Sequence, residues 1–300
     1  MRPNSIGDAR VAPLPFSTRR PQAAPKRSLA LHIAAYLIMI VLVLLVLLPL
    51  WWMVSTSLKA HQYILHTPPD LFPNPISFES YTRLGQEIDL LRTFFNSLLV
   101  GVVGTFAQII FAAMAAYAFA RMRWRGRDAV FVLYLATMMI PSVVLIVPQF
   151  IVVRMLGWTN TYAALIIPPI FTAFGTFLLR QAFQALPRDF EEAAFIDGAN
   201  HFTIFWRVLL PLIKPALATL TVLSFMGLWN SYLWPLFVAR NPAVMTLTVA
   251  LAQLQAGPNA LTEWNVVMAG AVITVLPLMI AYILAQKWFV QSVVANGIKG

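Results

Sequence analysis

Six long stretches of the chain contain no Asp, Glu, Lys or Arg, and they constrain its fold more than any other feature. They are residues 28–58, 93–120, 129–153, 155–179, 215–239 and 264–286. Each holds at least the ~20 apolar residues that a helix needs to cross ~30 Å of hydrocarbon. Because lipid offers no hydrogen-bond partner to the backbone, we expect helices at these positions.

The composition leads to the same fold class. Hydrophobic residues make up 60% of the chain and charged residues 11%, against roughly 45–50% and about 25% in soluble domains. A chain this apolar cannot bury its side chains in one aqueous core. We predict an all-α membrane protein with a transmembrane domain at 29–290 and six transmembrane helices, at about 31–54, 94–119, 129–152, 160–180, 213–238 and 265–287.

A seventh uncharged stretch, Asn241–Thr262, is harder to assign. Pro242, Gly257 and Pro258 interrupt it, and its apolar centre at about 244–254 is too short to cross a bilayer. We interpret it as a re-entrant or an interfacial helix.

The basic residues indicate which loops face the cytoplasm. With both termini inside, 16 of the 21 Lys and Arg residues fall in cytoplasmic segments and five fall outside, which agrees with the positive-inside rule. Membrane loops therefore explain the net charge of +10 without any nucleic-acid partner. We predict a disordered basic cytoplasmic tail at 1–28 and a cytoplasmic C-terminal tail at 291–300.

The sequence lacks the residues that would mark an enzyme or a self-powered carrier. It has no phosphate-binding P-loop motif, no Gly-x-Ser-x-Gly turn and no metal-ligand spacing among its four histidines. The uncharged stretches also lack the ionisable residue that ion-coupled carriers usually keep at membrane depth. We therefore expect a non-enzymatic transport chain without a metal or cofactor. A self-sufficient carrier or channel for a small polar solute stays as the alternative, since backbone carbonyls can also hold a sodium ion.

A few polar side chains fall within the predicted spans. Hydrogen bonding between helices explains them most simply. They could instead line a passage for a polar solute, and Asn230 beside Trp229 is the best placed. The candidates for this substrate path are Gln108, Gln149, Asn230, Ser231 and Tyr232.

The loop at 186–215, between the fourth and fifth spans, contains a short helix with clear start and stop signals. Asp189 and Glu192 have the spacing of a capping box, so we predict Asp189 as the N-cap. Gly198 can take the left-handed conformation that ends a helix. Pro211 and Pro215 then turn the chain back toward the membrane. The pattern predicts that the loop contains a short, rigid helix that connects the fourth and fifth spans.

Its motifs are also those of a known family. Glu192-Ala193-Ala194, followed by Asp197-Gly198-Ala199, Leu210-Pro211 and Pro215, resembles the signature loop of ABC importer permeases. The resemblance runs from the first span to the end of the chain, and it is closest to the shorter, six-helix permease of maltose-type carbohydrate importers. Supporting motifs are Asn160-Thr161-Tyr162, Trp229-Asn230, Trp234-Pro235 and the terminal Gly297-Ile298-Lys299-Gly300.

The resemblance implies a permease subunit of the bacterial inner membrane that forms half of a pathway for a sugar, oligosaccharide or polyol phosphate. The loop would be a cytoplasmic coupling helix docked on a dimer of ATPase subunits, which would bind ATP and Mg. A second homologous permease, an extracytoplasmic solute-binding protein and membrane lipid would be the other partners. The expected docking residues are Asp189, Glu192, Ala193, Ala194, Asp197, Gly198, Ala199, Leu210 and Pro211.

Overall fold

The computed structural model describes residues 29–64, 68, 70–256 and 263–297, and all regular elements in these ranges are helices. The predicted all-α class is therefore confirmed. The predicted tail at 1–28 lies outside the described residues, as do 298–300 of the predicted C-terminal tail. Residues 291–297 continue the last helix, α14 (Trp264–Gly297).

The chain divides into two compact units, residues 1–49 and 50–300. The described part of the first unit is the N-terminal portion of α1 (Leu29–Ser57). Large apolar side chains from Leu31 to Leu48 are exposed around this helix. Such a surface is stable only where lipid or another protein covers it.

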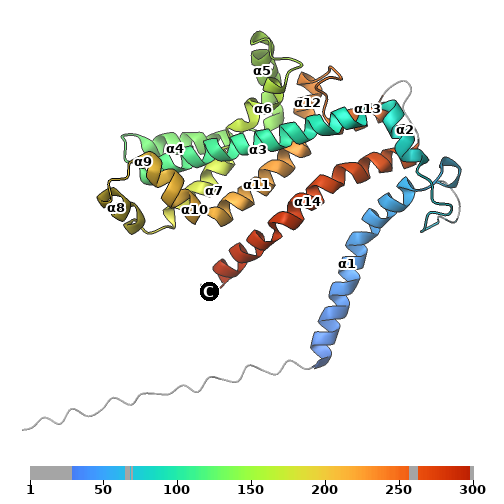
Figure 1. The fold of residues 1–300 in the computed structure, drawn as a ribbon, viewed down its shortest axis with the longest axis horizontal. Coiled ribbons are helices and arrows are strands. Elements are labelled where there is room, and N and C mark those ends of the chain that lie inside the picture. The colour runs from blue at the N-terminus through green and yellow to red at the C-terminus, as the bar shows by residue number, and fades with distance from the viewer. Residues whose placement is uncertain (1–28, 65–67, 69, 257–262, 298–300) are drawn as a thin grey trace, which may run out of the picture. The chain divides into compact units, whose positions relative to one another are not determined.

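The second unit is organised around α3 (Leu90–Arg121). Helices α7 (Ala173–Gln184) and α11 (Lys214–Trp229) pack against α3, and α14 packs against α11 and against α2 (Glu79–Glu87) (Figure 1). Small residues of α3 allow this close packing. A Cβ atom at Gly104 would lie 2.8 Å from the Leu228 side chain of α11.

Three described helices are long and apolar enough to cross a membrane: Leu31–Ser57, Leu90–Arg121 and Trp264–Leu284. Three bent pairs bring the total to as many as six. In the first pair, α4 (Arg127–Ala136) and η2 (Thr137–Met139) meet α5 (Ser142–Met155) at a bend of 102°. In the second, α6 (Tyr162–Ile166) and η3 (Pro168–Ile170) meet α7 at a bend of 44°. In the third, α9 (His201–Thr203), η4 (Ile204–Leu209) and α10 (Leu210–Leu212) meet α11 at a bend of 82°.

The predicted third, fourth and fifth spans therefore differ from continuous helices. Ile140 is extended before Pro141, because a proline disfavours the α conformation of the residue before it. The predicted span 213–238 is broken after Trp229 and resumes as α12 (Leu233–Val238).

The segment that we interpreted as re-entrant or interfacial contains α13 (Leu247–Ala256), a helix of 10 residues. It packs against α3 and α14, and Leu247, Val249 and Ala250 are buried. The Ser97 hydroxyl of α3 accepts a hydrogen bond of 2.8 Å from the Leu247 N–H. This burial in protein favours the re-entrant alternative. Residues 257–262 lie outside the described residues.

The two ends of α3 hold different parts of the chain. At its first turns, Asn96 donates hydrogen bonds to the carbonyls of Ala243 and Met245. At its last residue, Arg121 donates to the carbonyl of Leu186, close to the start of α8 (Asp189–Ile196) (Figure 1). A helix of 32 residues, roughly 48 Å long at the α-helical rise, thus separates α8 from the 243–247 segment.

Candidate functional site

The start of α8 corrects the predicted capping box. Arg188 is the N-cap, its side chain makes no capping hydrogen bond, and Asp189 is the first helical residue. The Arg188 carbonyl accepts from the N–H groups of Glu191 and Glu192, at 2.9 and 3.1 Å. The acids of the first turn, Asp189, Glu191 and Glu192, stabilise the helix through its dipole instead.

The end of α8 follows the prediction. Gly198 has a φ of +80°. Its N–H donates to the Phe195 carbonyl at 3.0 Å, and the Ala199 N–H donates to the Ala194 carbonyl at 2.9 Å. These two bonds form a Schellman motif. A Cβ atom at Gly198 would meet no other atom within 4 Å, so the position requires glycine for its conformation and not for space.

The inner face of α8 is attached to the membrane helices by an ion pair. Arg121 Nε lies 3.4 Å from Glu191 Oε1, and the two side chains are only 5% and 13% exposed. The same guanidinium donates to the carbonyl of Phe183, in the last turn of α7, and to the carbonyl of Leu186, just beyond that helix. One buried arginine therefore connects α3, the end of α7 and α8.

A second attachment lies where α9 and η4 meet α3. The Tyr117 hydroxyl is 3.0 Å from His201 Nδ1. The rings of Tyr117, Phe183 and Phe205 contact one another, with centroids 5.3 to 6.3 Å apart. Ala194 of α8 and Ala199 pack against this core. The small side chains let α8 approach it closely.

The outer face of the loop consists of Phe190, Ala193 and Ile196 of α8 with Phe202 of α9 and Trp206 of η4, and all five are exposed. Ile196 is 86% and Phe202 is 69% exposed. Contiguous exposed apolar side chains are typical of a surface that another protein covers.

The structure sorts the predicted docking residues into two groups. The exposed group is Asp189, Glu192, Ala193, Asp197, Gly198 and Pro211. The half-buried group is Ala194, Ala199 and Leu210, which pack against the core described above.

Sequence reasoning missed the groups that hold the loop in place. Arg121 and Glu191 belong to different helices, and no local pattern pairs them. Tyr117 and His201 are 84 positions apart. The apolar residues on the outer face were a usable signal, because Phe190 and Ile196 interrupt an otherwise acid-rich helix.

The candidates for the substrate path do not form one site. Gln149 and Ser231 line the same cavity of about 180 Å³, beside Pro169 and Trp234. Gln108 donates a hydrogen bond of 2.6 Å to the Pro169 carbonyl, as expected for helix–helix bonding. The other two candidates, Asn230 and Tyr232, are exposed.

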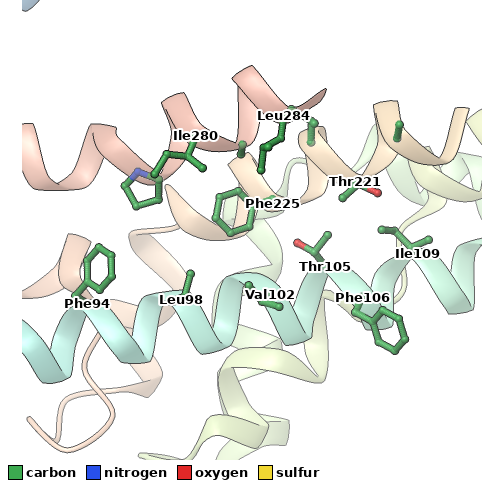
Figure 2. A pocket seen from close by; sticks show the side chains of 14 residues that line it. Phe94, Leu98, Val102, Thr105, Phe106, Ile109, Thr221, Phe225, Ile280 and Leu284 are labelled. Carbon is green, nitrogen blue, oxygen red and sulfur yellow. The ribbon is translucent and has the colours of Figure 1, made fainter. Parts of the chain in front are cut away.

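A larger groove of about 840 Å³ lies between α3, α11 and α14 (Figure 2). Its walls are apolar apart from Thr105 and Thr221, and the Thr221 hydroxyl donates to the Leu217 carbonyl of its own helix. The groove offers no charged group to a polar solute.

Apolar helices long enough to cross a membrane, with the loop at 186–215 fixed to one end of α3, are the arrangement expected of a transmembrane permease subunit. Residues 108–295 match the family described as "Binding-protein-dependent transport system inner membrane component". The chain belongs to this family, and it is an inner-membrane permease subunit of an ABC importer.

Known relatives align along almost the whole chain. The arabinooligosaccharides transport system permease protein AraQ of Bacillus subtilis (strain 168) is 34% identical over 273 residues, which cover 90% of this chain and 96% of AraQ. The sn-glycerol-3-phosphate transport system permease protein UgpE of Brucella abortus (strain 2308) is 33% identical, over 88% of this chain and 96% of UgpE.

Solved structures agree with the fold. A chain of a bacterial ABC transporter involved in the import of the acidic polysaccharide alginate superimposes with a TM-score of 0.79 at 29% identity, covering 89% of this chain and 100% of that chain. A chain of the MetNI methionine ABC transporter superimposes with a TM-score of 0.52 at 17% identity, over 70% of this chain and 96% of that chain. The second likeness concerns the fold alone.

Proposed function

We propose that this subunit imports its solute by accepting mechanical work from a separate cytoplasmic ATPase dimer through the loop at 186–215. The observation that carries the proposal is the two-sided character of α8. Its inner face is fixed to α3 by the Arg121–Glu191 ion pair. Its exposed face carries the large apolar side chains Phe190 and Ile196, with the acids Asp189 and Glu192 also exposed. A partner that binds the outer face of α8 and then moves would also displace the membrane helices to which α8 is fixed.

The path of the movement follows from the chain itself. The Schellman turn at Gly198 holds the direction in which the chain leaves α8. From His201 to Trp229 the chain is helical almost without interruption, through α9, η4 and α10 into α11. Closure of the ATPase dimer would therefore displace α8 and tilt α11 against α3. ATP and Mg²⁺ would be bound by the ATPase subunits, and this chain would have no ATPase site of its own.

This role sets the orientation in the membrane. The Arg121 end of α3 and both termini would face the cytoplasm. The opposite end, with α2 and α13, would face outward and receive the extracytoplasmic solute-binding protein. A second, homologous permease would complete the passage. The four arginines from Arg121 to Arg127 support this orientation.

The proposed solute is a sugar, an oligosaccharide or a polyol phosphate. The relatives named above belong to transport systems for arabinooligosaccharides and sn-glycerol-3-phosphate, and the structural neighbour takes part in alginate import. Gln149 and Ser231, which share a cavity, would be the first residues of this chain to test for contact with hydroxyl groups.

Reconstitution tests the proposal against a self-sufficient carrier. The chain is placed in liposomes alone, or together with its second permease, ATPase and loaded binding protein. We expect uptake of labelled solute only in the complete assembly and only with ATP. Uptake by the chain alone would establish the carrier and refute the proposal.

A further inference from the structure

The turn at residues 122–126 connects α3 to α4 at the α8 end of the molecule. Five residues reach at most roughly 17 Å when extended. Because α4 exposes Val132 and Leu133 and begins directly after the turn, burial of α4 in lipid would place the turn at the depth of the headgroups. The groups that it presents would then lie at the membrane surface.

A cavity of about 450 Å³ opens at this turn. It is lined by Arg123, Trp124, Gly126, Arg127, Asp128, Ala129 and Arg188. Three arginines against one aspartate give the lining a formal charge of +2. The cavity is therefore suited to an anion.

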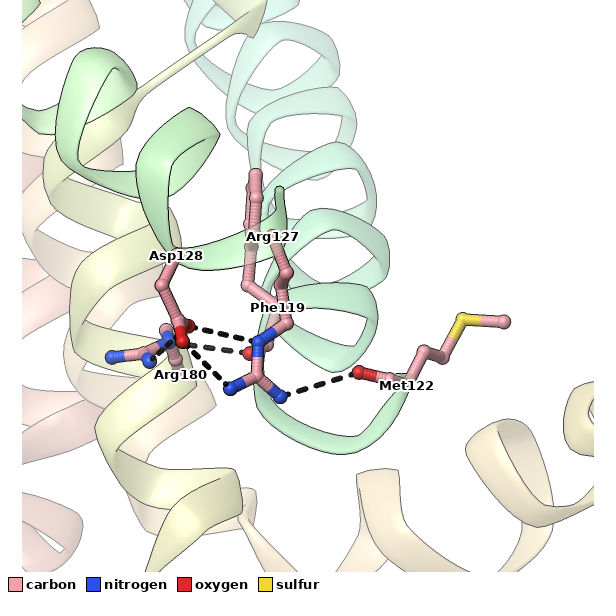
Figure 3. Close-up of polar contacts among 5 residues, drawn as sticks. All are labelled: Phe119, Met122, Arg127, Asp128 and Arg180. Atoms are coloured by element: carbon pink, nitrogen blue, oxygen red, sulfur yellow. Dashed lines mark hydrogen bonds and ion pairs between the residues drawn. The ribbon is translucent and has the colours of Figure 1, made fainter. Parts of the chain in front are cut away.

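The single acid in the lining is already neutralised. Asp128 Oδ1 lies 2.9 Å from Arg127 Nε, and its Oδ2 lies 3.3 Å from Arg127 Nη2 (Figure 3). Arg180 Nη2 approaches the same carboxylate at 3.9 Å. Arg123 and Arg188 are exposed, and their side chains form no hydrogen bond or ion pair within the part of the chain that the structure describes. These two guanidinium groups are available to a ligand.

Contacts of Arg127 and Arg180 with the rest of the chain fix one wall of the cavity in place. Arg127 also donates to the Met122 carbonyl at 3.3 Å, across the turn (Figure 3). Arg180 lies over the Phe131 ring at 4.1 Å and donates to the Phe119 carbonyl. Trp124 contacts the Phe119 ring and is 42% exposed, as is typical of tryptophan at a membrane interface.

We propose that this cavity binds the phosphate of an anionic phospholipid headgroup between Arg123 and Arg188. Guanidinium groups bind phosphate through paired charge-assisted hydrogen bonds, and clustered arginines at a membrane surface attract anionic lipids. The depth of the turn favours lipid over an acidic surface of a protein partner.

The site has a consequence for coupling that rests on the proposed function. Arg188 is the N-cap residue of α8. A headgroup held by its side chain would tie the start of α8 to the membrane surface, next to the turn that ends α3. The lipid would then restrict α8 to a hinge motion about its N-terminus.

Native mass spectrometry of the full-length chain in detergent tests the site without any ATPase. The probes are dioctanoyl phosphatidylglycerol and, as the zwitterionic control, dioctanoyl phosphatidylcholine. We expect the chain to prefer phosphatidylglycerol, and the Arg123→Gln/Arg188→Gln variant to bind it about tenfold more weakly. The matched control is Arg154→Gln/Arg240→Gln, which removes the same charge from two exposed arginines outside the cavity.

The other outcomes are equally decisive. Equal binding of both lipids, equal loss in the control variant, or full displacement by an equal concentration of inorganic phosphate would overturn the lipid site. The Arg123→Lys/Arg188→Lys variant separates a lost site from a misfolded chain, because we expect it to keep most of the binding. Failure of ATPase docking in a Gly198 variant would leave this measurement unchanged, so the two proposals fail separately.

Discussion

Arg121 and Glu191 form a largely buried ion pair between the last residue of α3 and the first turn of α8, with 3.4 Å between Nε and Oε1. It is a direct ionic link between the signature loop and the central membrane helix. Breaking a buried pair is costly because the remaining charge keeps its desolvation penalty without its partner.

Glu191→Gln should therefore destabilise the subunit, by about 1–3 kcal/mol. The adjacent Glu192 is exposed and provides the control, because Glu192→Gln removes only its interaction with the helix dipole and should cost about 0.5 kcal/mol. Denaturant unfolding in detergent, followed by circular dichroism, measures both. Equal stability of the two variants would mean that the pair does not secure α8.

The positive φ at Gly198 predicts a graded series of substitutions. Gly198→Asn should retain transport, Gly198→Ala should reduce it, and Gly198→Val should abolish it while the chain still inserts into the membrane. A β-branched residue resists this conformation most, and asparagine tolerates it best. Solute uptake and coupled ATP hydrolysis by the assembled transporter give the readout.

A substitution at Gly157 distinguishes a loss of coupling in the Gly198 variants from a general effect of backbone strain. It has a φ of +69°, and, as at Gly198, no atom lies within 4 Å of the position that a Cβ would take, but it is far from α8 in the chain. Gly157→Val should retain more transport than Gly198→Val. If both variants lose transport equally, the series reports folding strain and not coupling.

The outer face of the loop predicts an effect on association without an effect on stability. Ile196→Ser should weaken binding of the ATPase at least about tenfold, since exposed apolar anchors at the centre of an interface carry much of its affinity. Ile76→Ser is the matched control, because Ile76 is also exposed, at 64%, and lies outside the loop. Co-purification of the ATPase with each variant, alongside its melting temperature, checks the prediction.

The uncharged stretches predicted where apolar helices lie but not where they bend. The presence of a proline alone does not determine whether a helix bends. Pro49, Pro148 and Pro277 lie inside helices, whereas the chain bends sharply at Pro141. Neighbouring helices can satisfy the backbone groups that a proline frees, so tertiary packing determines the outcome at each proline.

In the loop at 186–215, features that depend on neighbouring residues were predictable from the sequence, and contacts between distant residues were not. The turn at Gly198 was predictable because its conformational requirement belongs to one residue. The N-cap prediction at Asp189 was wrong by one position, since the acids act on the helix dipole without a capping bond. The pairing of Arg121 with Glu191 depends on how α3 and α7 pack, which no short motif encodes.

Asn96 predicts a role for the opposite end of α3. It is buried, donates to the carbonyls of Ala243 and Met245, and accepts a hydrogen bond of 2.7 Å from the Tyr162 hydroxyl. Asn96→Ala leaves the Met245 carbonyl and the Tyr162 hydroxyl unpaired, whereas the Ala243 carbonyl keeps its bond from Arg92 Nε. The loss should cost about 2–3 kcal/mol of stability.

Tyr162→Phe provides the comparison for Asn96, because it removes only the hydroxyl and leaves the two bonds to the 243–245 backbone in place. We expect Asn96→Ala to expose α13 to proteolysis, whereas Tyr162→Phe should keep it protected. Since α8 lies at the other end of α3, ATPase association should be unchanged in both variants. Loss of ATPase binding in Asn96→Ala would show that the two ends of α3 are not independent, and the assignment of docking to the α8 end alone would then be wrong.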